Sequence, residues 1–362
     1  MITIDVRWLS VSGIGTYLRN LVPGIIAAFP REDFCLLGDP GEMQRHGLLR
    51  QANVIPVSAA ASMYSVREQF EIARKIPRST RLYLATHYNV PLLYRGRMLV
   101  TVYDLFHVAM PELVGGWHKS VYARCMFEAV RRKAAAIITI SRFTRDELIR
   151  YTGERPQAQP IHPIHLGVDD SWFDIPRLAN PHGRPYLLYV GNVKPHKNLG
   201  ALVKAFTLVT NDIGHDLLIV GKKEGFITGD TASMFDAERL LGRVNFTGYV
   251  TDESLKQYMA HADAFVFPSL YEGFGLPPLE AMASGSPVIA SNAASLPEIC
   301  GDAALYCDPR RPEDIAARIR ELLGNHALRD SLIRKGRAHA RQFTWDACIA
   351  RTCEVMRGLL IQ

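Results

Sequence analysis

The sequence predicts an α/β fold made of two similar-sized domains, each a doubly wound parallel sheet. The chain has 362 residues and is 48% hydrophobic, which is enough for a large core but exceeds the usual size of one domain. Short β-branched runs alternate with helical patterns, and this order implies parallel sheets with helices on both faces. The alternation is interrupted once, near the middle of the chain.

The first domain is predicted to span residues 1–170. Short apolar runs predict its strands, and apolar residues at helical spacing predict its helices. The expected strands are 2–6, 34–37, 53–56, 82–86, 98–102 and 136–140, and the expected helices are 15–29, 64–75, 116–134 and 142–150.

Residues 169–185 contain three prolines and no periodicity, which predicts a linker. The alternation then restarts and predicts a second domain over 171–343. Its expected strands are 186–191, 216–221, 244–248, 263–268 and 287–291, and its expected helices are 198–210, 235–242, 252–260, 276–284, 311–324 and 327–341.

The last segment, about 344–362, predicts a packed helix, although periodicity does not tell where it docks. One face of this helix carries Trp345, Cys348, Ile349, Thr352, Cys353, Met356 and Leu359.

Cysteine usage and hydropathy bound the class of protein. The six cysteines form no Cys-x-x-Cys pair and no zinc-ligand spacing, so we expect free, mostly buried thiols. The start of the chain lacks a basic flank followed by an apolar run, and no window approaches about eighteen uninterrupted apolar residues. We therefore expect a cytosolic protein with no signal peptide and no membrane span.

The excess positive charge lies in the first half of the chain. Residues 1–170 contain 21 Lys and Arg against 15 Asp and Glu, whereas residues 171–362 contain 21 of each. A domain with such an excess of positive charge could bind nucleic acid, an anionic substrate or an anionic membrane surface. The densest run, 131–133, ends a predicted helix that begins with aromatic residues. Peripheral membrane contact is one interpretation, and a solvated helix end stabilised by the helix dipole is the more common one.

Two loops at predicted strand ends have the chemistry of an anion site. Ligands of open parallel sheets gather at the carboxyl ends of the strands, where helix N-termini face anions. Gly13 and Gly15 open a helix after the first strand, without the last glycine of a dinucleotide fingerprint or a P-loop lysine. Lys194, His196 and Lys197 follow the first strand of the second domain and are credible phosphate ligands. Each of these cations, taken alone, is also explained as a solvated loop residue.

A third loop, "DAFVFPSLYEGFGLPPLEAMASG", combines a strand, a glycine turn and a short helix. Prolines are tolerated in the first turn of a helix, and Gly285 is the expected stop. Glu272 lies in the turn and Glu280 about one turn into the helix. A carboxylate can accept two hydroxyl hydrogen bonds, which suits ribose diols and sugar rings, while the turn and helix N-terminus can face a diphosphate. The alternative is that Glu280 only stabilises the helix dipole and Glu272 is an incidental loop acid. The glycine and proline setting and the basic loop earlier in the same domain disfavour it.

Several motifs together resemble one family. "YEGFGLPPLEAMASGSPVIAS" resembles the E-x7-E motif of the family 4 retaining glycosyltransferases (GT4), and "YVGNVKPHKNL" resembles their phosphate-binding loop. "GIGTYLRNL", "TVYDLFHVAMPE", "TISRFTRDEL" and "IHLGVD" resemble further landmarks in the family's order. The resemblance covers nearly the full chain. The combination of motifs is specific for the family, whereas, of the single motifs, only E-x7-E is specific.

The resemblance implies a GT-B fold, in which two Rossmann-like domains face each other across a cleft and the C-terminal helix crosses back to the first domain. It implies an acceptor-binding domain at 1–170 and a nucleotide-sugar-binding domain at 171–343. The donor-binding residues that it implies are Gly13, Gly15, Asn192, Lys197, Glu272, Gly273, Phe274, Gly275, Leu276 and Glu280.

The matched positions also imply individual roles. Glu280 would hold the ribose hydroxyls and Glu272 the hydroxyls of the transferred sugar, while Lys197 and Gly15 would hold the diphosphate. His87 and Asp104 are expected on the acceptor side.

The implied catalytic residues are Glu272, Lys197, Tyr103 and His107. The chain departs from the family at two positions: Asn192 stands where relatives commonly carry Arg, and Tyr103 stands where they carry His. His107 and His87 are alternatives for the role of that His.

The resemblance implies transfer with retention of anomeric configuration and without a metal or other cofactor, and no Asp-x-Asp occurs in the sequence. The leaving diphosphate would help to deprotonate the acceptor, with Lys197 and backbone N–H groups offsetting its charge.

Motifs like those of mannosyltransferases make GDP-mannose the first expectation and UDP-glucose the second. The expected acceptor is a glycan or lipid-linked oligosaccharide of bacterial polysaccharide synthesis, and nucleic acid is not an expected partner. With a lipid-linked acceptor, the protein would work at the inner face of the plasma membrane.

Two other functions fit parts of the pattern. A GT-B enzyme of different chemistry, such as a nucleotide-sugar epimerase, would need a general base near the sugar ring. A two-lobed sugar-binding protein of the periplasmic kind would close over its ligand in a similar way, but it would be expected to carry an export signal.

Overall fold

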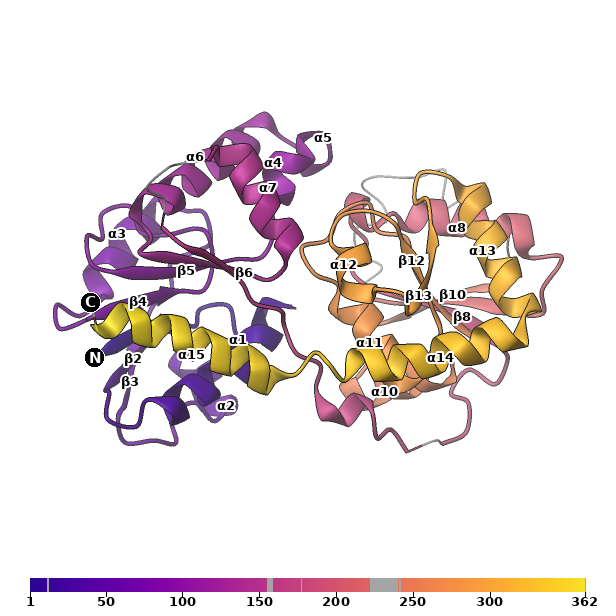
Figure 1. Ribbon diagram of the computed structural model, residues 1–362, viewed down its shortest axis with the longest axis horizontal. Helices are drawn as coiled ribbons and strands as arrows, with labels where there is room; N and C mark the ends of the chain where they lie inside the picture. The colour runs from indigo at the N-terminus through magenta and orange to yellow at the C-terminus, as the bar shows by residue number, and fades with distance from the viewer. Residues whose placement is uncertain (12, 155–158, 177, 222–239, 241, 362) are drawn as a thin grey trace. The chain divides into compact units, whose positions relative to one another are not determined.

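The computed structural model describes residues 1–11, 13–154, 159–176, 178–221, 240 and 242–361 (Figure 1). The helix predicted at 235–242 therefore falls almost wholly outside the described residues. The chain divides into two compact units. The first unit comprises Met1–Gly167 and Thr344–Gln362, and the second comprises Val168–Phe343.

The first unit contains a seven-stranded parallel sheet in the order β3-β2-β1-β4-β5-β6-β7. Its strands are short. Five of the seven are wholly buried, as expected where helices cover both faces, whereas the edge strands β3 and β7 are partly exposed. The strands are β1 (Ile2–Asp5), β2 (Phe34–Gly38), β3 (Val54–Ser58), β4 (Leu82–Ala85), β5 (Met98–Val102), β6 (Ala136–Thr139) and β7 (Ile161–Pro163).

Three helices of the first unit, α2, α3 and α7, begin at a residue whose side chain caps the helix. The Ser65 hydroxyl accepts a hydrogen bond from the Glu68 amide at the start of α3, and Ser141 does the same for Thr144 at the start of α7. The helices are α1 (Ile14–Ala28), α2 (Pro40–Arg45), α3 (Val66–Lys75), α4 (Phe106–Ala109), α5 (Pro111–Val114), α6 (Trp117–Lys133), α7 (Arg142–Thr152) and α15 (Trp345–Ile361).

The C-terminal helix α15 packs within the first unit, against α1, β4 and β6. Gly24 of α1 allows this close approach, because a Cβ there would lie 2.5 Å from Ile349 Cδ1. The buried residues of α15 lie on the predicted apolar face and are Cys348, Thr352, Cys353, Met356 and Leu359. All six cysteines are free and five are buried, which confirms the expectation for the thiols.

The second unit contains a six-stranded parallel sheet in the order β10-β9-β8-β11-β12-β13. A 3₁₀ turn at Asp170–Trp172 is the regular structure described in the predicted linker. The strands are β8 (Tyr186–Val190), β9 (Asp216–Val220), β10 (Val244–Gly248), β11 (Ala264–Phe267), β12 (Val288–Ser291) and β13 (Ala304–Cys307).

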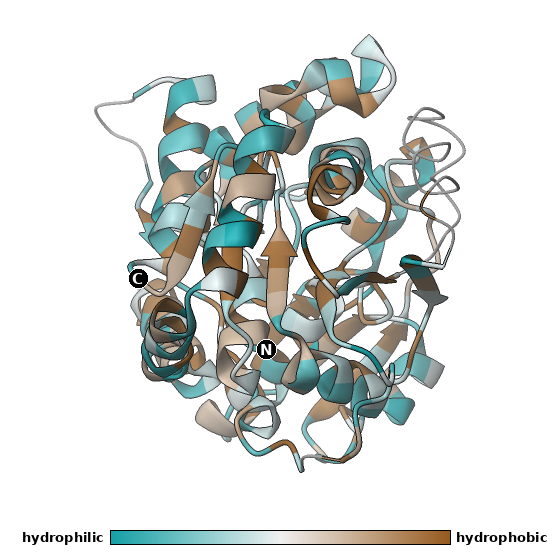
Figure 2. Cartoon of the chain, turned by 90° about the vertical axis from the view of Figure 1, so that its right-hand side faces the viewer, coloured by the Kyte–Doolittle hydropathy of each residue, from teal (hydrophilic) through white to brown (hydrophobic). Residues whose placement is uncertain are grey.

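Helices cover the second sheet in the same manner, with α8 and α13 sharing one buried core through residues such as Phe206 and Ile319. The described helices of this unit are α8 (Leu199–Val209), α10 (Asp252–His261), α11 (Leu276–Ser284), α12 (Leu296–Cys300), α13 (Pro312–Gly324) and α14 (His326–Ala340). In Figure 2 the central strands are mostly brown, whereas the helices carry both apolar and polar residues, as amphipathic covering helices should.

Both sheets place their first and fourth strands side by side, β1 next to β4 and β8 next to β11. The chain leaves these neighbouring strands in opposite directions, which makes each pair a topological switch point. In open α/β sheets, ligands bind at this place, beyond the carboxyl ends of the strands. The prediction of two doubly wound parallel α/β domains is therefore confirmed, and each has a candidate site position.

The basic run at the end of α6 differs from the predicted solvated helix end. Arg131 is buried, and its guanidinium donates to Thr152 Oγ1 (3.1 Å) and to the Gly153 carbonyl (3.3 Å). Arg132 pairs with Glu128. Because local partners bind these cations, the run is not a free basic patch. Within the described ranges, every helix falls short of the length or apolar character that a membrane span requires.

Candidate active site

Two loops meet at the switch point of the second sheet. One follows β8 and contains residues 191–198, and the other follows β11 and contains residues 268–275. The Leu270 amide donates to the His196 carbonyl at 2.8 Å and joins the two loops directly. The strand order therefore brings together two segments that lie about seventy residues apart in the sequence.

Asn198 fixes this junction from the side of α8. It adopts a left-handed conformation with φ of 59°, which Asn tolerates better than most residues. Its side-chain amide donates to the carbonyls of Pro268 (3.0 Å) and Pro309 (2.6 Å). One side chain thus holds the loops that follow β8, β11 and β13.

The structure brings Lys197 and Glu272 into direct contact. Lys197 Nζ lies 2.6 Å from Glu272 Oε1, and 19% and 13% of the two side chains are exposed. The ammonium also lies 5.3 Å from the centre of the Phe267 ring. Because the site is partly open, a ligand can replace this contact. An anionic group can bind the lysine, and hydrogen-bond donors can bind the carboxylate.

The N-terminus of α11 lies beside this ion pair in the sequence and in the fold. Gly275 has φ of 126°, and a Cβ there would lie 2.8 Å from Leu296 Cδ2, so only glycine fits the turn. The Ser295 hydroxyl lies 2.9 Å and 2.6 Å from the carbonyl oxygens of Glu272 and Phe274 and fixes the same turn. Pro277 and Pro278 have no N–H, which reduces the number of helix-start amides that need a partner.

The remaining predicted donor residues of this unit lie in the same two loops. The Leu276 amide has no hydrogen-bond partner among the described residues and is the first amide of α11. Gly273 is buried in the turn, whereas Asn192 is exposed and its carbonyl accepts from the Lys194 amide at 3.0 Å.

Glu280 lies one turn into α11 and is partly buried. Burial raises the pKa of this carboxyl to about 7, and the nearby carboxylates of Asp252 and Asp169 add to the rise, while Lys256 opposes it. The group therefore titrates near neutral pH. As a carboxylate it can accept two hydroxyl hydrogen bonds, and it loses part of this capacity on protonation.

The switch point of the first sheet carries a different set of side chains. His87 follows β4, and Tyr103, Asp104 and His107 follow β5. The ring centres of His87 and Tyr103 lie 6.4 Å apart. The four predicted residues of this unit therefore share one edge of the sheet.

His87 is neutral in this environment. Burial lowers the pKa of His87 to about 3, although Asp5 opposes the shift. The Asn89 amide donates to His87 Nδ1 at 3.1 Å, so the proton of the neutral ring is on Nε2. His87 can therefore donate a hydrogen bond from Nε2, but it does not supply positive charge near neutral pH.

Tyr103 occupies the position at which the resemblance implies a histidine. Its ring packs edge-on against Tyr17, with ring centres 5.5 Å apart, and its hydroxyl is buried with no hydrogen-bond partner among the described residues. Burial raises the pKa of this phenol well above its usual value, so the group stays protonated. It can act as a neutral donor, but not as a base near neutral pH.

Asp104 lies in the turn after β5, and His107 lies in the helix that follows, α4. Asp104 Oδ1 accepts the Phe106 amide at 3.0 Å and so stabilises the start of α4. His107 lies in α4, with its Nδ1 3.5 Å from the Tyr88 hydroxyl. The structure therefore gives Asp104 a structural contact as well as a position at the sheet edge.

The two predicted glycines open α1 in the first unit. Gly13 has φ of 74° at the helix N-cap, and a Cβ on Gly15 would clash with the Leu9 carbonyl. The Gly15 amide donates to the Val11 carbonyl at 2.5 Å. Close approach of the backbone is thus a sufficient local reason for glycine at position 15.

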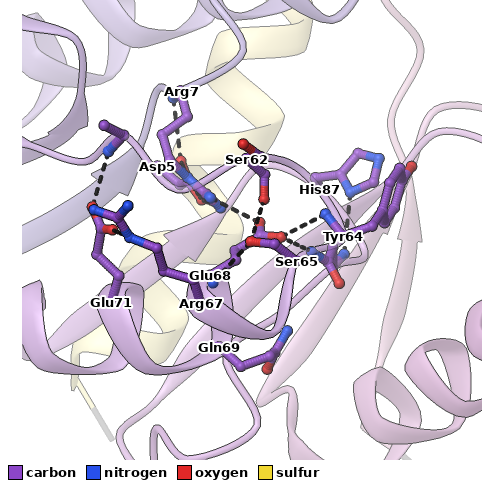
Figure 3. Close-up of polar contacts among 12 residues, drawn as sticks. Asp5, Arg7, Ser62, Tyr64, Ser65, Arg67, Glu68, Gln69, Glu71 and His87 are labelled. Atoms are coloured by element: carbon purple, nitrogen blue, oxygen red, sulfur yellow. Dashed lines mark hydrogen bonds and ion pairs between the residues drawn. The ribbon is translucent and has the colours of Figure 1, made fainter.

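The sequence analysis missed a buried ionic network beside His87. Arg7 binds Asp5 through several hydrogen bonds, which include Nε to Oδ1 at 2.9 Å and Nη2 to Oδ2 at 2.7 Å, and Arg7 Nη1 lies 2.7 Å from Glu68 Oε1 (Figure 3). No more than 5% of each side chain is exposed. The Ser65-x-x-Glu68 capping pattern could have indicated the helix start, but nothing in the sequence links Glu68 to Arg7.

The two switch points offer different chemistry. In the second unit, a lysine and a helix start can face an anion, and two carboxylates can bind hydroxyl groups. In the first unit, the charges of Asp5, Arg7 and Glu68 are buried and paired, and the groups nearer the surface are aromatic or polar, with the carboxylate of Asp104 among them. Among the described residues, no three His, Cys, Asp or Glu side chains are grouped as metal ligands.

Comparisons with known proteins agree with this geometry. The family model described as "Glycosyl transferases group 1" matches residues 170–339. The O-antigen chain mannosyltransferase B of Escherichia coli is 32% identical over 276 residues, which cover 73% of this chain and 71% of that protein.

Solved structures share the fold over nearly the full chain. Sucrose-phosphate synthase from Thermosynechococcus elongatus superimposes with a TM-score of 0.79, at 21% identity and 99% coverage of both chains. Anabaena HepE in complex with UDP and glucose gives a TM-score of 0.77, at 18% identity and the same coverage. These neighbours confirm the predicted GT-B fold, and with the sequence relatives they lead to one conclusion: the chain belongs to the group 1 (GT4-type) glycosyltransferases and is a glycosyltransferase similar to mannosyltransferases.

Proposed function

We propose that this enzyme transfers mannose from GDP-mannose, with retention of configuration, to a glycan or lipid-linked oligosaccharide in bacterial polysaccharide synthesis. The observation that carries the proposal is the Lys197–Glu272 contact at the switch point of the second sheet, beside the start of α11. The choice of mannose is supported by the similarity to the E. coli O-antigen chain mannosyltransferase B.

In this proposal the second unit binds the donor. Lys197 and the Leu276 amide bind the diphosphate, with Phe274 and Gly275 shaping the turn. Glu272 leaves the lysine and accepts hydroxyl hydrogen bonds from the transferred sugar, while Glu280 accepts those of the ribose. Charge grows on the diphosphate as the glycosidic bond breaks, and a fixed cation stabilises that charge more in the transition state than in the ground state.

We assign acceptor binding to the first unit. His87 offers a neutral Nε2–H donor. Asp104 lies in the turn after the neighbouring strand, and His107 lies in the helix that follows it. Tyr103 is a protonated phenol and cannot supply the positive charge of a histidine, so its role in the proposal is that of a neutral hydrogen-bond donor. The leaving diphosphate takes the acceptor proton.

A panel of nucleotides and nucleotide sugars tests the donor assignment. GDP and GDP-mannose should raise the melting temperature of the wild-type protein more than UDP and UDP-glucose do, because a ligand that prefers the native state stabilises it. Glu280→Ala should weaken this shift. A larger shift with the uridine compounds would assign the second donor, UDP-glucose, and no shift with any of them would contradict the proposal.

We also propose peripheral contact of the first unit with an anionic membrane that holds the acceptor. The excess of cations in residues 1–170 supports this idea, as do Trp117 and Val121, which are 79% and 51% exposed at the start of α6 beside Lys119. Flotation with vesicles containing anionic lipid should recover the protein, and less of the Trp117→Ala variant. Absence of wild-type protein from the vesicle fraction would contradict this part.

A further inference from the structure

Tyr64 holds a backbone conformation that needs a physical cause. Its φ is 60°, in the left-handed region that bulky residues rarely adopt. The residue lies between β3 and α3, at the carboxyl edge of the first sheet. Strained backbone persists only where its surroundings fix it, and it is concentrated at functional sites.

Glu68 is the group that fixes this conformation. The Tyr64 amide donates to Glu68 Oε2 at 2.8 Å, while the Glu68 amide donates to the Ser65 hydroxyl at 3.2 Å (Figure 3). The Glu68 carboxylate is 1% exposed and pairs with Arg7, which Asp5 holds in turn. A buried and paired carboxylate has little freedom to move, so it determines where the Tyr64 backbone lies.

The same carboxylate connects Tyr64 with the segment after β4. The Asn89 side-chain amide donates to Glu68, and its oxygen accepts the hydroxyl of Tyr122. Asn89 is buried, and its backbone amide holds the tautomer of His87. The network therefore fixes the positions of Tyr64 and of the neutral His87 together, at the same edge of the first sheet.

The Tyr64 ring is enclosed on several sides but not covered. Its centre lies 6.0 Å from that of His87, 6.2 Å from that of His107 and 5.9 Å from that of Tyr122, all at steep angles. The hydroxyls of Tyr64 and Tyr88 are 3.3 Å apart. Even so, 39% of Tyr64 is exposed. A residue needed only for packing would gain nothing from a strained backbone that leaves more than a third of the residue exposed.

We propose that Tyr64 is a stacking platform for a sugar ring of the acceptor, and that Glu68 is the positioning residue that sets it. This inference rests on the proposed function, which assigns the acceptor to the first unit. A pyranose ring presents C–H bonds on a face and hydroxyls at its rim. The electron-rich face of an aromatic ring attracts such C–H bonds, and neighbouring polar groups can bind the hydroxyls.

The neighbours of Tyr64 suit an uncharged sugar. His87 offers Nε2–H and carries no charge at neutral pH, and the phenols of Tyr88 and Tyr122 stay protonated because burial raises the pKa of each, that of Tyr122 to about 12. Of the charged groups nearby, Arg7 and Glu68 are buried and bound to each other, whereas Asp104 is a partly exposed carboxylate that can accept hydroxyl hydrogen bonds. An anion would find no available cation among these residues, whereas hydroxyl groups find donors and acceptors.

Saturation-transfer NMR with methyl α-D-mannoside and α-linked mannobiose tests the platform in the full-length protein. Irradiation of the aromatic protons should transfer saturation most strongly to the C–H protons on one face of one sugar ring. Tyr64→Ala should remove this transfer and raise the dissociation constant of mannobiose about tenfold, the effect expected for one lost aromatic contact. Tyr64→Trp should retain most of both.

Tyr249 supplies a matched control, because it is a tyrosine that is 81% exposed and lies in the second unit. Tyr249→Ala should leave both the saturation pattern and the dissociation constant unchanged. The melting temperature of each variant, measured without ligand, shows that the protein is folded. No saturation transfer from the wild type, or the same transfer from Tyr64→Ala, would overturn the platform.

Glu68→Gln tests the positioning role. Glutamine keeps an acceptor oxygen but loses the ion pair with Arg7, so the dissociation constant of mannobiose should rise while that of GDP stays the same. In combination with Tyr64→Ala, Glu68→Gln should add less than its own separate effect, because both changes act through one ring. Full additivity, or an equal loss of GDP binding, would overturn this role.

The GDP measurements also separate this inference from the proposed function. If GDP and UDP leave the wild-type melting temperature unchanged while mannobiose binds through Tyr64, the donor assignment fails and the platform stands. If GDP binds but mannobiose binding does not depend on Tyr64, the platform fails and the donor assignment stands.

Discussion

The two switch points of the molecule differ in how they hold their polar groups. In the second unit, the Lys197–Glu272 pair is partly exposed, and backbone hydrogen bonds between loops hold it in place. In the first unit, the Arg7–Glu68 pair is almost wholly buried, and it holds other residues in place. The comparison indicates that one ion pair is available to exchange with a charged ligand, whereas the other is part of the scaffold of a neutral surface.

The largest difference should appear in stability. Arg7→Met leaves two carboxylates buried without their cation, so it should lower the free energy of unfolding by about 4 kcal/mol. Lys197→Met removes one member of a partly exposed pair and should cost less than about 1 kcal/mol. Urea unfolding of both variants measures the two effects. Similar losses would show that burial does not distinguish the pairs.

Lys197→Met should reduce activity strongly, although its effect on stability is small. Lys197→Met removes the cation assigned to the leaving diphosphate, and kcat should fall by a factor of about 10² to 10³, the range found when one electrostatic stabiliser is lost. Lys204→Met, at an exposed position of α8, is the matched control and should keep its activity. Initial rates with GDP-mannose measure this, and a fall of less than about threefold in Lys197→Met would contradict the assignment.

The buried carboxyl of Glu280 should make stability depend on pH. The folded-state pKa of about 7 lies above the reference value of 4.5, so ionisation in the folded protein opposes folding. Stability should therefore fall as pH rises from about 4.5 to 7 and level off above, by up to about 3 kcal/mol. Glu280→Gln should remove this slope and be more stable than wild type at pH 8, although it binds GDP more weakly. Parallel melting-temperature profiles for the two proteins would contradict the shift.

The smallest effect concerns the junction of the second-unit loops. Asn198→Gly keeps the left-handed conformation but loses the hydrogen bonds to Pro268 and Pro309, at a cost of about 1 kcal/mol. Asn198→Ala loses the same bonds and adds backbone strain, which should cost about 1 kcal/mol more. Thermal unfolding measures both variants. Equal stability of the two would indicate that the left-handed backbone contributes no strain.

Most of the fold was predictable because its strands are apolar runs bounded by turn residues and its helices are long and periodic. The missed elements are short: α2, α4, α5 and α12 have four to six residues, and β7 and β13 have three and four. A helix of four to six residues shows less than two turns, and β7 has less than two strand repeats, so periodicity cannot reveal these elements. The packing of their neighbours determines their structure instead.

The two candidate sites also differ in how far the sequence could predict them. The loop with Glu272 and the helix with Glu280 form one continuous stretch of sequence, so spacing alone indicated a site. Around Tyr64, the contributing residues come from five separate segments, after β1, β3, β4 and β5 and from α6, and only the tertiary fold brings them together. The roles assigned to Lys197, Glu280 and His87 remain predictions, whereas the Lys197–Glu272 and Asn89–His87 contacts, each within one unit, are properties of the fold.

The distribution of thiols has a practical consequence. Cys125 on α6 is exposed, while the other five thiols are buried, and burial raises the pKa of each, that of Cys300 to about 12. Because thiolate is the reactive form, a maleimide dye at neutral pH should label the unmodified protein at this single position. The dye would sit one turn from Tyr122 and could report occupancy of the neighbouring surface by fluorescence, without any engineered cysteine.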